Sequence, residues 1–295
     1  MQQTLILMLT TGVLWTLVGI VFGRAPDDRA GLRSFFALNG MVYVLFIWLF
    51  RFPQPAEPLE VLHLSIFMLP AAIVEMVGFL LLKYAMARGS QGLAWSIAQS
   101  AMILPFLGAI AFLNNHAGAL KYAGVAVLLT GLILVGKSKQ RKRDDEAETN
   151  GRKGYLSFAF GAFLLIGLGQ FLRIIPGNIG FSEAVLSWRL PLTAPCGMIF
   201  WTCYSLSTHT FVPGKVWKIA LSYGIIVALG QICFFYAVDA ADLLGITSIV
   251  YPVAVGTSIL LFSVYCVTFR KEKFSLCGWF GVVLITFGIA LLSVR

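Results

Sequence analysis

The sequence predicts an all-α fold: a polytopic membrane bundle of ten transmembrane helices, arranged as two inverted five-helix repeats. Three observations support this prediction: the composition, the spacing of the apolar runs and the similarity of the two halves. Of the 295 residues, 59% are hydrophobic and 12% are charged, whereas a soluble domain is about 45–50% apolar and about 25% charged. Because the apolar excess is spread along the chain, a soluble domain with one anchor is excluded.

The apolar runs are long enough to cross a membrane, since a span needs about 20 apolar residues to cover ~30 Å of hydrocarbon. Residues 4–22 are expected to remain as a helix, because MQQ supplies no positive charge and no A-x-A cleavage site follows. The predicted spans, in order, are 4–22, 35–50, 64–87, 92–113, 118–136, 154–175, 182–206, 216–238, 243–268 and 275–294.

One long polar segment, 137–153, divides the chain into halves of five spans each. It reads KSKQRKRDDEAETNGRK and is predicted to be a charged, solvated cytoplasmic linker. The domains are therefore a first repeat over 1–136, the linker, and a second repeat over 154–295. The basic run of the linker lacks aromatic residues or a nucleic-acid-binding motif, so no nucleic-acid partner is predicted.

The two halves resemble each other at corresponding places. Tyr84 matches Tyr236 and Ser96 matches Ser248, both at an offset of 152 residues. The last spans of the two halves share a glycine spacing, with Gly124 and Gly131 in the first and Gly281 and Gly288 in the second. These glycines are interpreted as close-packing points. Five is an odd number, so the second repeat must enter the membrane inverted, an arrangement common in secondary transporters.

Basic residues predict the orientation. Of the 22 Lys and Arg, sixteen lie in loops that follow odd-numbered spans, and Lys83 and Arg189 lie inside spans. The remaining four are Arg51, Lys121, Arg173 and Arg295. By the positive-inside rule the odd loops face the cytoplasm, which places both termini on the non-cytoplasmic side of an inner (plasma) membrane.

Two ionisable residues lie well inside predicted spans, where a charge costs about 2.5–3.5 kcal/mol on insertion scales. Glu75 in span three and Arg189 in span seven both lie ~10 Å from the outer face, counting 1.5 Å per residue. Two interpretations stay open: a structural ion pair between them, or a substrate-binding pair in which Glu75 also titrates. Arg173 is interpreted as interfacial, and Lys83 is expected to extend its amine to the interface.

Polar and aromatic residues at similar depth complete the candidate substrate site. They are Gln170, Gln231, Gln99, Asn39, Trp15, Trp95 and Tyr251. The amides are equally consistent with hydrogen bonds between helices, and the rings with stacking on a sugar or another ring. Pro105 and Pro252 are expected to kink spans four and nine.

Other chemistry is not indicated. The five cysteines form no C-x-x-C motif, and the three histidines are far apart without metal-ligand spacing. No phosphate-binding loop or hydrolase motif is found. The sequence therefore predicts no enzyme activity, no metal and no cofactor.

The chain resembles the drug/metabolite transporter superfamily in its ten-span form. The resemblance rests on Gly12–Trp15 in span one, the stretch Tyr84–Gly89 with Ser96 and Pro105, and the paired glycines. It implies a substrate cavity lined by both halves. Basic loops after odd spans favour the sugar/rhamnose-permease-like subgroup over the common EamA-like pattern. Span one lacks the glutamate on which the cationic-drug pumps of the superfamily rely.

The expected function is secondary transport of a small polar metabolite, sugar-like as first choice, through a central alternating-access cavity. The alternatives are an amino-acid or other metabolite exporter of the same fold and, from another class, a membrane enzyme or scaffold. The expected partners are a small-molecule substrate and the lipid bilayer. The coupling ion (a proton among the candidates) and the oligomeric state, including a monomer, are left open.

Overall fold

The computed structural model describes residues 2–50, 52–112, 118–137, 154–242, 244 and 250–292, apart from the side chains of Gly136, Asp239 and Asp242. Within these ranges the chain is helical and contains no strand. The elements are α1 (Gln2–Gly23), α2 (Arg29–Phe50), α3 (Pro58–Arg88), α4 (Gln91–Gln99), η1 (Ser100–Met102), α5 (Ile103–Phe112), α6 (Ala119–Lys137), α7 (Tyr155–Asn178), α8 (Glu183–Leu186), α9 (Arg189–Ser207), α10 (Pro213–Asp242), α11 (Val250–Thr268) and α12 (Leu276–Leu292).

Within the described part of the chain, seven helical segments are long and apolar enough to cross a membrane, so the protein is a multi-pass membrane protein. They are α1, α2, α3, the segment from α4 through α5, α7, α10 and α11. The apolar helices α6 and α12 are shorter, and α9 occupies the remaining predicted span. Leucine, isoleucine and phenylalanine side chains are exposed around the bundle (Leu5, Ile66 and Phe280 among them), as expected where lipid replaces water.

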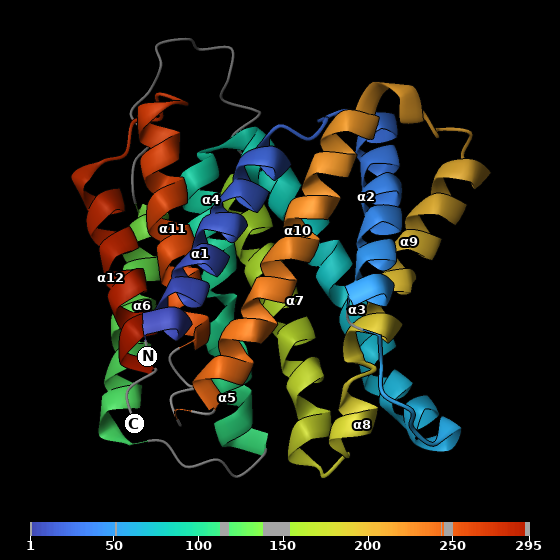
Figure 1. The fold of residues 1–295 in the computed structure, drawn as a ribbon. Helices are drawn as coiled ribbons and strands as arrows, with labels where there is room; N and C mark the ends of the chain where they lie inside the picture. Colours follow the sequence, from blue (N-terminus) through green and yellow to red (C-terminus); the bar gives the residue numbers. More distant parts are fainter. Residues whose placement is uncertain are drawn as a thin grey trace.

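The helices run alternately up and down (Figure 1). We call the end at which α6 ends and α7 begins the linker end, and the end at which α1 begins and α12 ends the terminal end. The basic residues Arg24, Arg88 and Lys271 flank helix boundaries at the linker end. The predicted linker residues 138–153, with Arg51 and Arg295, lie outside the described residues.

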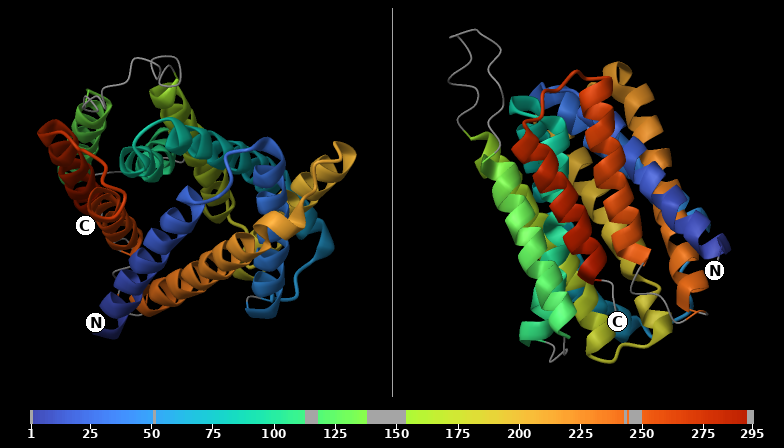
Figure 2. Two further views of the ribbon diagram at one scale, coloured as in Figure 1. Left: turned by 90° about the horizontal axis from the view of Figure 1, so that it is seen from above. Right: turned by 90° about the vertical axis from the view of Figure 1, so that its left-hand side faces the viewer.

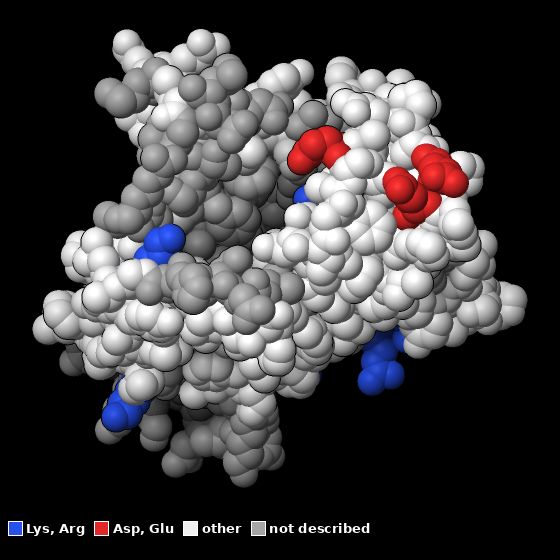
Figure 3. Space-filling view, turned by 90° about the horizontal axis from the view of Figure 1, so that it is seen from below, with Lys and Arg blue, Asp and Glu red and all other residues white. Residues whose placement is uncertain are grey.

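Acidic side chains gather on one part of the face at the terminal end, and basic side chains lie elsewhere on the same face (Figure 3). The helix boundaries place Glu57, Glu60 and Glu183 at this end. Lys121, in the first turn of α6, lies at this end as well, so the described terminal end carries charges of both signs, and the orientation stays a prediction.

The main helix contacts join the two halves. Helix α3 packs on α7, α1 on α10 and α11, α2 on α9 and α10, and α4 on α11. Helices α6 and α12 lie side by side at one edge of the bundle (Figure 2). A Cβ atom on Gly124 would lie 3.0 Å from the Gly288 carbonyl oxygen, and one on Gly131 would lie 2.8 Å from that of Gly281. The interpretation of these four glycines as close-packing points is confirmed.

One of the two expected kinks is confirmed. The fourth predicted span breaks into α4, η1 and α5, and Pro105 lies four residues after Ala101 of η1, where its missing N–H leaves a helical bond unmade. Pro252 lies near the start of α11 as described, and residues 245–249 before it lie outside the described residues, so the kink expected at Pro252 stays a prediction.

Candidate functional site

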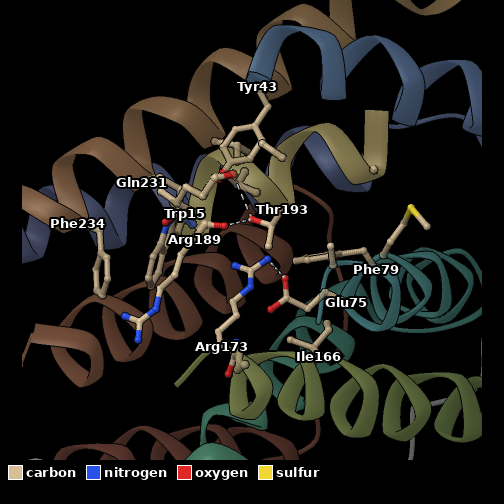
Figure 4. Close-up of a pocket in the computed structure, with 18 of the residues that line it drawn as sticks. Trp15, Tyr43, Glu75, Phe79, Ile166, Arg173, Arg189, Thr193, Gln231 and Phe234 are labelled. Carbon is tan, nitrogen blue, oxygen red and sulfur yellow. Dashed lines mark hydrogen bonds and ion pairs between the residues drawn. The ribbon is translucent and has the colours of Figure 1, made fainter. Parts of the chain in front are cut away.

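A central cavity of about 730 Å³ lies between the two halves. Helices α1 to α5 line it from the first half, and α7, α9, α10 and α11 from the second. All nine residues predicted for the substrate site line it: Glu75, Arg189, Gln231, Gln170, Trp15, Gln99, Trp95, Asn39 and Tyr251. Figure 4 shows ten labelled side chains of this cavity. The structure thus brings the predicted residues together, while their role in binding stays a prediction.

The partner of Glu75 is Arg173 of α7, not Arg189. An Arg173 nitrogen lies 2.5 Å from Oε2 of Glu75, and the two side chains point toward each other in Figure 4. The Glu75 side chain is 12% exposed and that of Arg173 is 30% exposed. A Cβ atom on Gly169, one turn before Arg173, would overlap the Glu75 side chain. Gly169 therefore makes room for the carboxylate against α7.

The interpretation of Arg173 as interfacial is also wrong. The sequence places the end of the sixth span at residue 175, two residues beyond Arg173. Helix α7 continues through Pro176 to Asn178, which moves Arg173 deeper by about one turn. The signal that the sequence offered was the i, i+4 spacing of Gly169 and Arg173, which places both on one face of the helix.

Arg189 lies at the first position of α9, at the level where the cavity approaches the terminal end. Its Nε is buried without a hydrogen-bond partner, and in the view of Figure 4 its guanidinium points away from Glu75. A Cβ atom on Gly177 would lie 2.8 Å from Nη2 of Arg189. The absence of a side chain at Gly177 therefore lets the guanidinium lie against α7.

Three aromatic rings form one wall of the cavity. Trp15 lies 5.4 Å from Phe234 and 5.7 Å from Tyr251, and Phe234 lies 5.6 Å from Tyr251, measured between ring centroids. We call these three residues the aromatic wall. The Gln170 amide donates a hydrogen bond of 3.1 Å to the Tyr251 hydroxyl, while its Oε1 has no partner. The wall therefore offers flat apolar faces beside a polar edge.

Two of the predicted site residues have structural hydrogen bonds. Nδ2 of Asn39 donates to the Phe35 carbonyl 2.9 Å away, within its own helix. The indole N–H of Trp95 donates to the Ser258 hydroxyl at 3.2 Å, and Trp95 is 2% exposed. Trp95 is thus fixed between α4 and α11 at the closed end of the cavity.

An aromatic layer closes the cavity toward the linker end. It consists of Phe22, Phe35, Phe36, Phe79 and Tyr223, whose ring centroids are 5.1–6.3 Å apart in the pairs that touch. Phe22 and Phe35 are fully buried. Trp201 stacks on Phe36 at 5.0 Å. No sequence pattern had indicated this layer, because its members come from α1, α2, α3 and α10.

Polar contacts between the halves lie beyond that layer at the linker end. The Glu272 carboxylate accepts hydrogen bonds from the Ser90 hydroxyl (2.6 Å) and from the N–H groups of Gln91 (3.0 Å) and Gly92 (3.3 Å) at the start of α4. Within the first half, the Lys83 side chain is 2% exposed, and its amine pairs at 2.9 Å with Asp27, which follows α1 at the linker end and is 71% exposed. The Lys83 amine therefore extends to an exposed carboxylate at that end, in the direction that the sequence predicts.

No group of three or more His, Cys, Asp or Glu residues in the described ranges is arranged to hold a metal ion. The cavity instead combines one carboxylate, two guanidinium groups, amides and aromatic rings. Such groups can bind a small polar or charged molecule through hydrogen bonds and ring faces.

The chain matches no protein-family model and no curated protein sequence. It is similar to a solved structure described only as "Crystal structure of protein", with a TM-score of 0.52 and 17% sequence identity. That similarity covers 99% of this chain and 97% of the other. At this identity the similarity concerns the fold alone, and it extends over the whole bundle.

Proposed function

We propose that this protein is a secondary transporter of the drug/metabolite transporter type, which moves a small polar metabolite across the inner (plasma) membrane. The observation that carries this proposal is the central cavity, which is lined by both halves, contains the Glu75–Arg173 pair and is closed toward one end by the aromatic layer. Transporters built from inverted repeats bind their substrates between the repeats, and alternating access opens such a site toward one side of the membrane at a time.

Reciprocal contacts support two inverted five-helix repeats. If the halves are repeats, α3 corresponds to α10 and α7 corresponds to α1. The contact between α3 and α7 then corresponds to the contact between α10 and α1, and both are present. Gly78 of α3 lies against Ile166 of α7, and Gly230 of α10 lies against Trp15 of α1. The residue offsets are 152 for the glycines and 151 for their partners. Helices α6 and α12 also correspond to each other, and their paired glycines lie against one another.

The lining favours a polar solute with a flat or ring-shaped part. Amides from Gln170, Gln231, Gln99 and Asn39 supply donors and acceptors, and the aromatic wall supplies apolar faces. A sugar-like solute remains the first choice on this basis, with an amino acid or another exported metabolite as the alternative. The alternative from another class is a membrane enzyme or scaffold. A scaffold is less well supported, since a scaffold does not require an ion pair inside a cavity.

The proposed orientation puts the linker end in the cytoplasm. In that orientation the structure corresponds to the outward-facing state, with the aromatic layer and the Glu272 contacts closing the inner side. The inner membrane is proposed from the positive-inside pattern.

Flux measurements in proteoliposomes test the proposal. The purified protein, reconstituted with and without a pH gradient, is expected to accelerate the exchange of at least one solute from a panel of sugars, sugar acids and amino acids. Glu75→Gln is expected to reduce that flux, whereas Glu60→Gln, the same change at an exposed site on the same helix, is expected to leave it unchanged. Flux equal to that of empty liposomes across the whole panel would refute transport of these solutes.

A further inference from the structure

The charges inside the cavity do not balance. Its charged lining residues are Glu75, Arg173 and Arg189. Glu75 and Arg173 neutralise each other through their ion pair. The cavity therefore holds one excess positive charge, and that charge belongs to Arg189.

Arg189 has no ion pair or hydrogen bond to its guanidinium within the described part of the chain. Glu183 acts on it electrostatically but lies beyond the 4.0 Å of an ion pair. A half-buried guanidinium with its Nε unsatisfied is costly in an apolar layer. A bound anion would satisfy this group, since a guanidinium presents two parallel N–H donors to a carboxylate.

We propose that Arg189 binds the carboxylate of the transported solute, so that the substrate class is a small organic monocarboxylate. This inference rests on the proposed function and narrows it, because a neutral sugar would leave Arg189 without a partner and a sugar acid would not. The carboxylate lies against Arg189 at the terminal end of the cavity, and the body of the solute extends along the aromatic wall.

The neighbouring groups favour one negative charge over other charge patterns. A zwitterion needs an acidic group for its ammonium, and Glu75 is engaged by Arg173. A phosphate carries a charge of about −1.5 to −2 at pH 7, which exceeds the single unbalanced positive charge. In the view of Figure 4 the Arg189 guanidinium lies on the same side as Trp15 and Phe234, away from Glu75. One solute can therefore touch Arg189 and the aromatic wall together.

Matched pairs of charged and neutral probes test the inference on the purified protein in detergent. Phenylacetate and gluconate are the acids, phenylacetamide and glucose are their neutral counterparts, and inorganic phosphate is the third kind of probe. Binding is measured as a shift in melting temperature, since a ligand of the native state raises it, and by titration calorimetry. At least one acid is expected to bind, and to bind about tenfold or more tightly than its neutral counterpart and than phosphate.

Two variants connect the binding to Arg189. Arg189→Gln is expected to weaken binding of the acid by about tenfold or more and to leave binding of the neutral probe unchanged. Arg88→Gln, the same substitution at the linker end, serves as the control and retains acid binding. Gly177→Ala keeps the inference testable if Arg189→Gln does not fold. Its new methyl group displaces only the flexible end of Arg189, so it weakens acid binding while the protein still folds.

The possible outcomes separate this inference from the proposed function. Equal binding of the acids and their neutral counterparts, absence of any acid binding, or acid binding that survives both Arg189→Gln and Gly177→Ala would overturn the inference. If proteoliposomes nevertheless exchange a neutral sugar, the proposed transport function stands and only the inference about Arg189 fails. If they exchange neither neutral nor anionic solutes, the proposed function fails as well.

Discussion

Replacing Glu75 by glutamine leaves Arg173 without its carboxylate partner inside the cavity. Removing one partner of a fully buried ion pair costs about 3–5 kcal/mol of folding free energy, and an exposed pair is worth about 0–1 kcal/mol. The Glu75 side chain is 12% exposed and that of Arg173 is 30% exposed, so water reaches the arginine in part. We therefore expect Glu75→Gln to lower the free energy of unfolding by about 2–3 kcal/mol.

The assay is a double-mutant cycle on the purified protein in micelles, with unfolding by denaturant followed by circular dichroism. Glu75→Gln, Arg173→Gln and the double variant are compared with the unchanged protein. Each single variant leaves a charge unpaired and the double variant does not, so the double variant is expected to be more stable than the sum of the single losses implies. Glu60→Gln is the control, and it is expected to change the stability by less than about 1 kcal/mol.

A coupling energy between Glu75 and Arg173 near zero would refute the reasoning, as would a loss in Glu60→Gln equal to that in Glu75→Gln. In either case the measured loss could not be attributed to the ion pair. If Glu75 were instead coupled to Arg189, Glu75→Gln would show its interaction energy in a cycle with Arg189→Gln and none with Arg173→Gln.

Three further predictions concern the bundle around the cavity. Gly131→Val places its Cβ 2.7 Å from the backbone nitrogen of Ile285 in α12. It is expected to lower the stability of the protein by about 1–3 kcal/mol, measured by thermal unfolding. In the control Gly118→Ala, the new Cβ meets nothing within 4 Å, so little stability is lost. Glu272→Gln weakens the hydrogen bonds at the start of α4 and is expected to favour opening of the linker end by about 1–2 kcal/mol. A cysteine at Phe79 in a cysteine-free background then reacts with maleimide about 5–30 times faster, and an unchanged rate would mean that Glu272 does not hold that end closed. Reporter fusions after Arg295 and within 137–153 are expected to report the outer side and the cytoplasm respectively, and the reverse result would remove the preference for a sugar-permease-like orientation.

The sequence singled out many of the polar and charged residues that line the cavity, although not Arg173. A polar or charged side chain in an apolar span is rare enough to be recognised without a structure. Glu75, Arg189 and the amides Gln170 and Gln231 were found in this way, and all of them line the cavity. The glycine spacing of the last span in each half likewise predicted close packing, because a helix pair can approach closely only where side chains are absent.

The tertiary structure alone decided which charges meet. The depth of a residue along its helix can be counted from the sequence. The rotation of α3 and α7 about their axes cannot be obtained in this way, nor can the residue at which α7 ends. These place Arg173, rather than Arg189, against Glu75. For the same reason the pairing of Lys83 with Asp27 and the aromatic layer were not predicted. Periodicity and composition report what one helix contains, whereas an ion pair or a closed ring layer depends on which faces of several helices pack together.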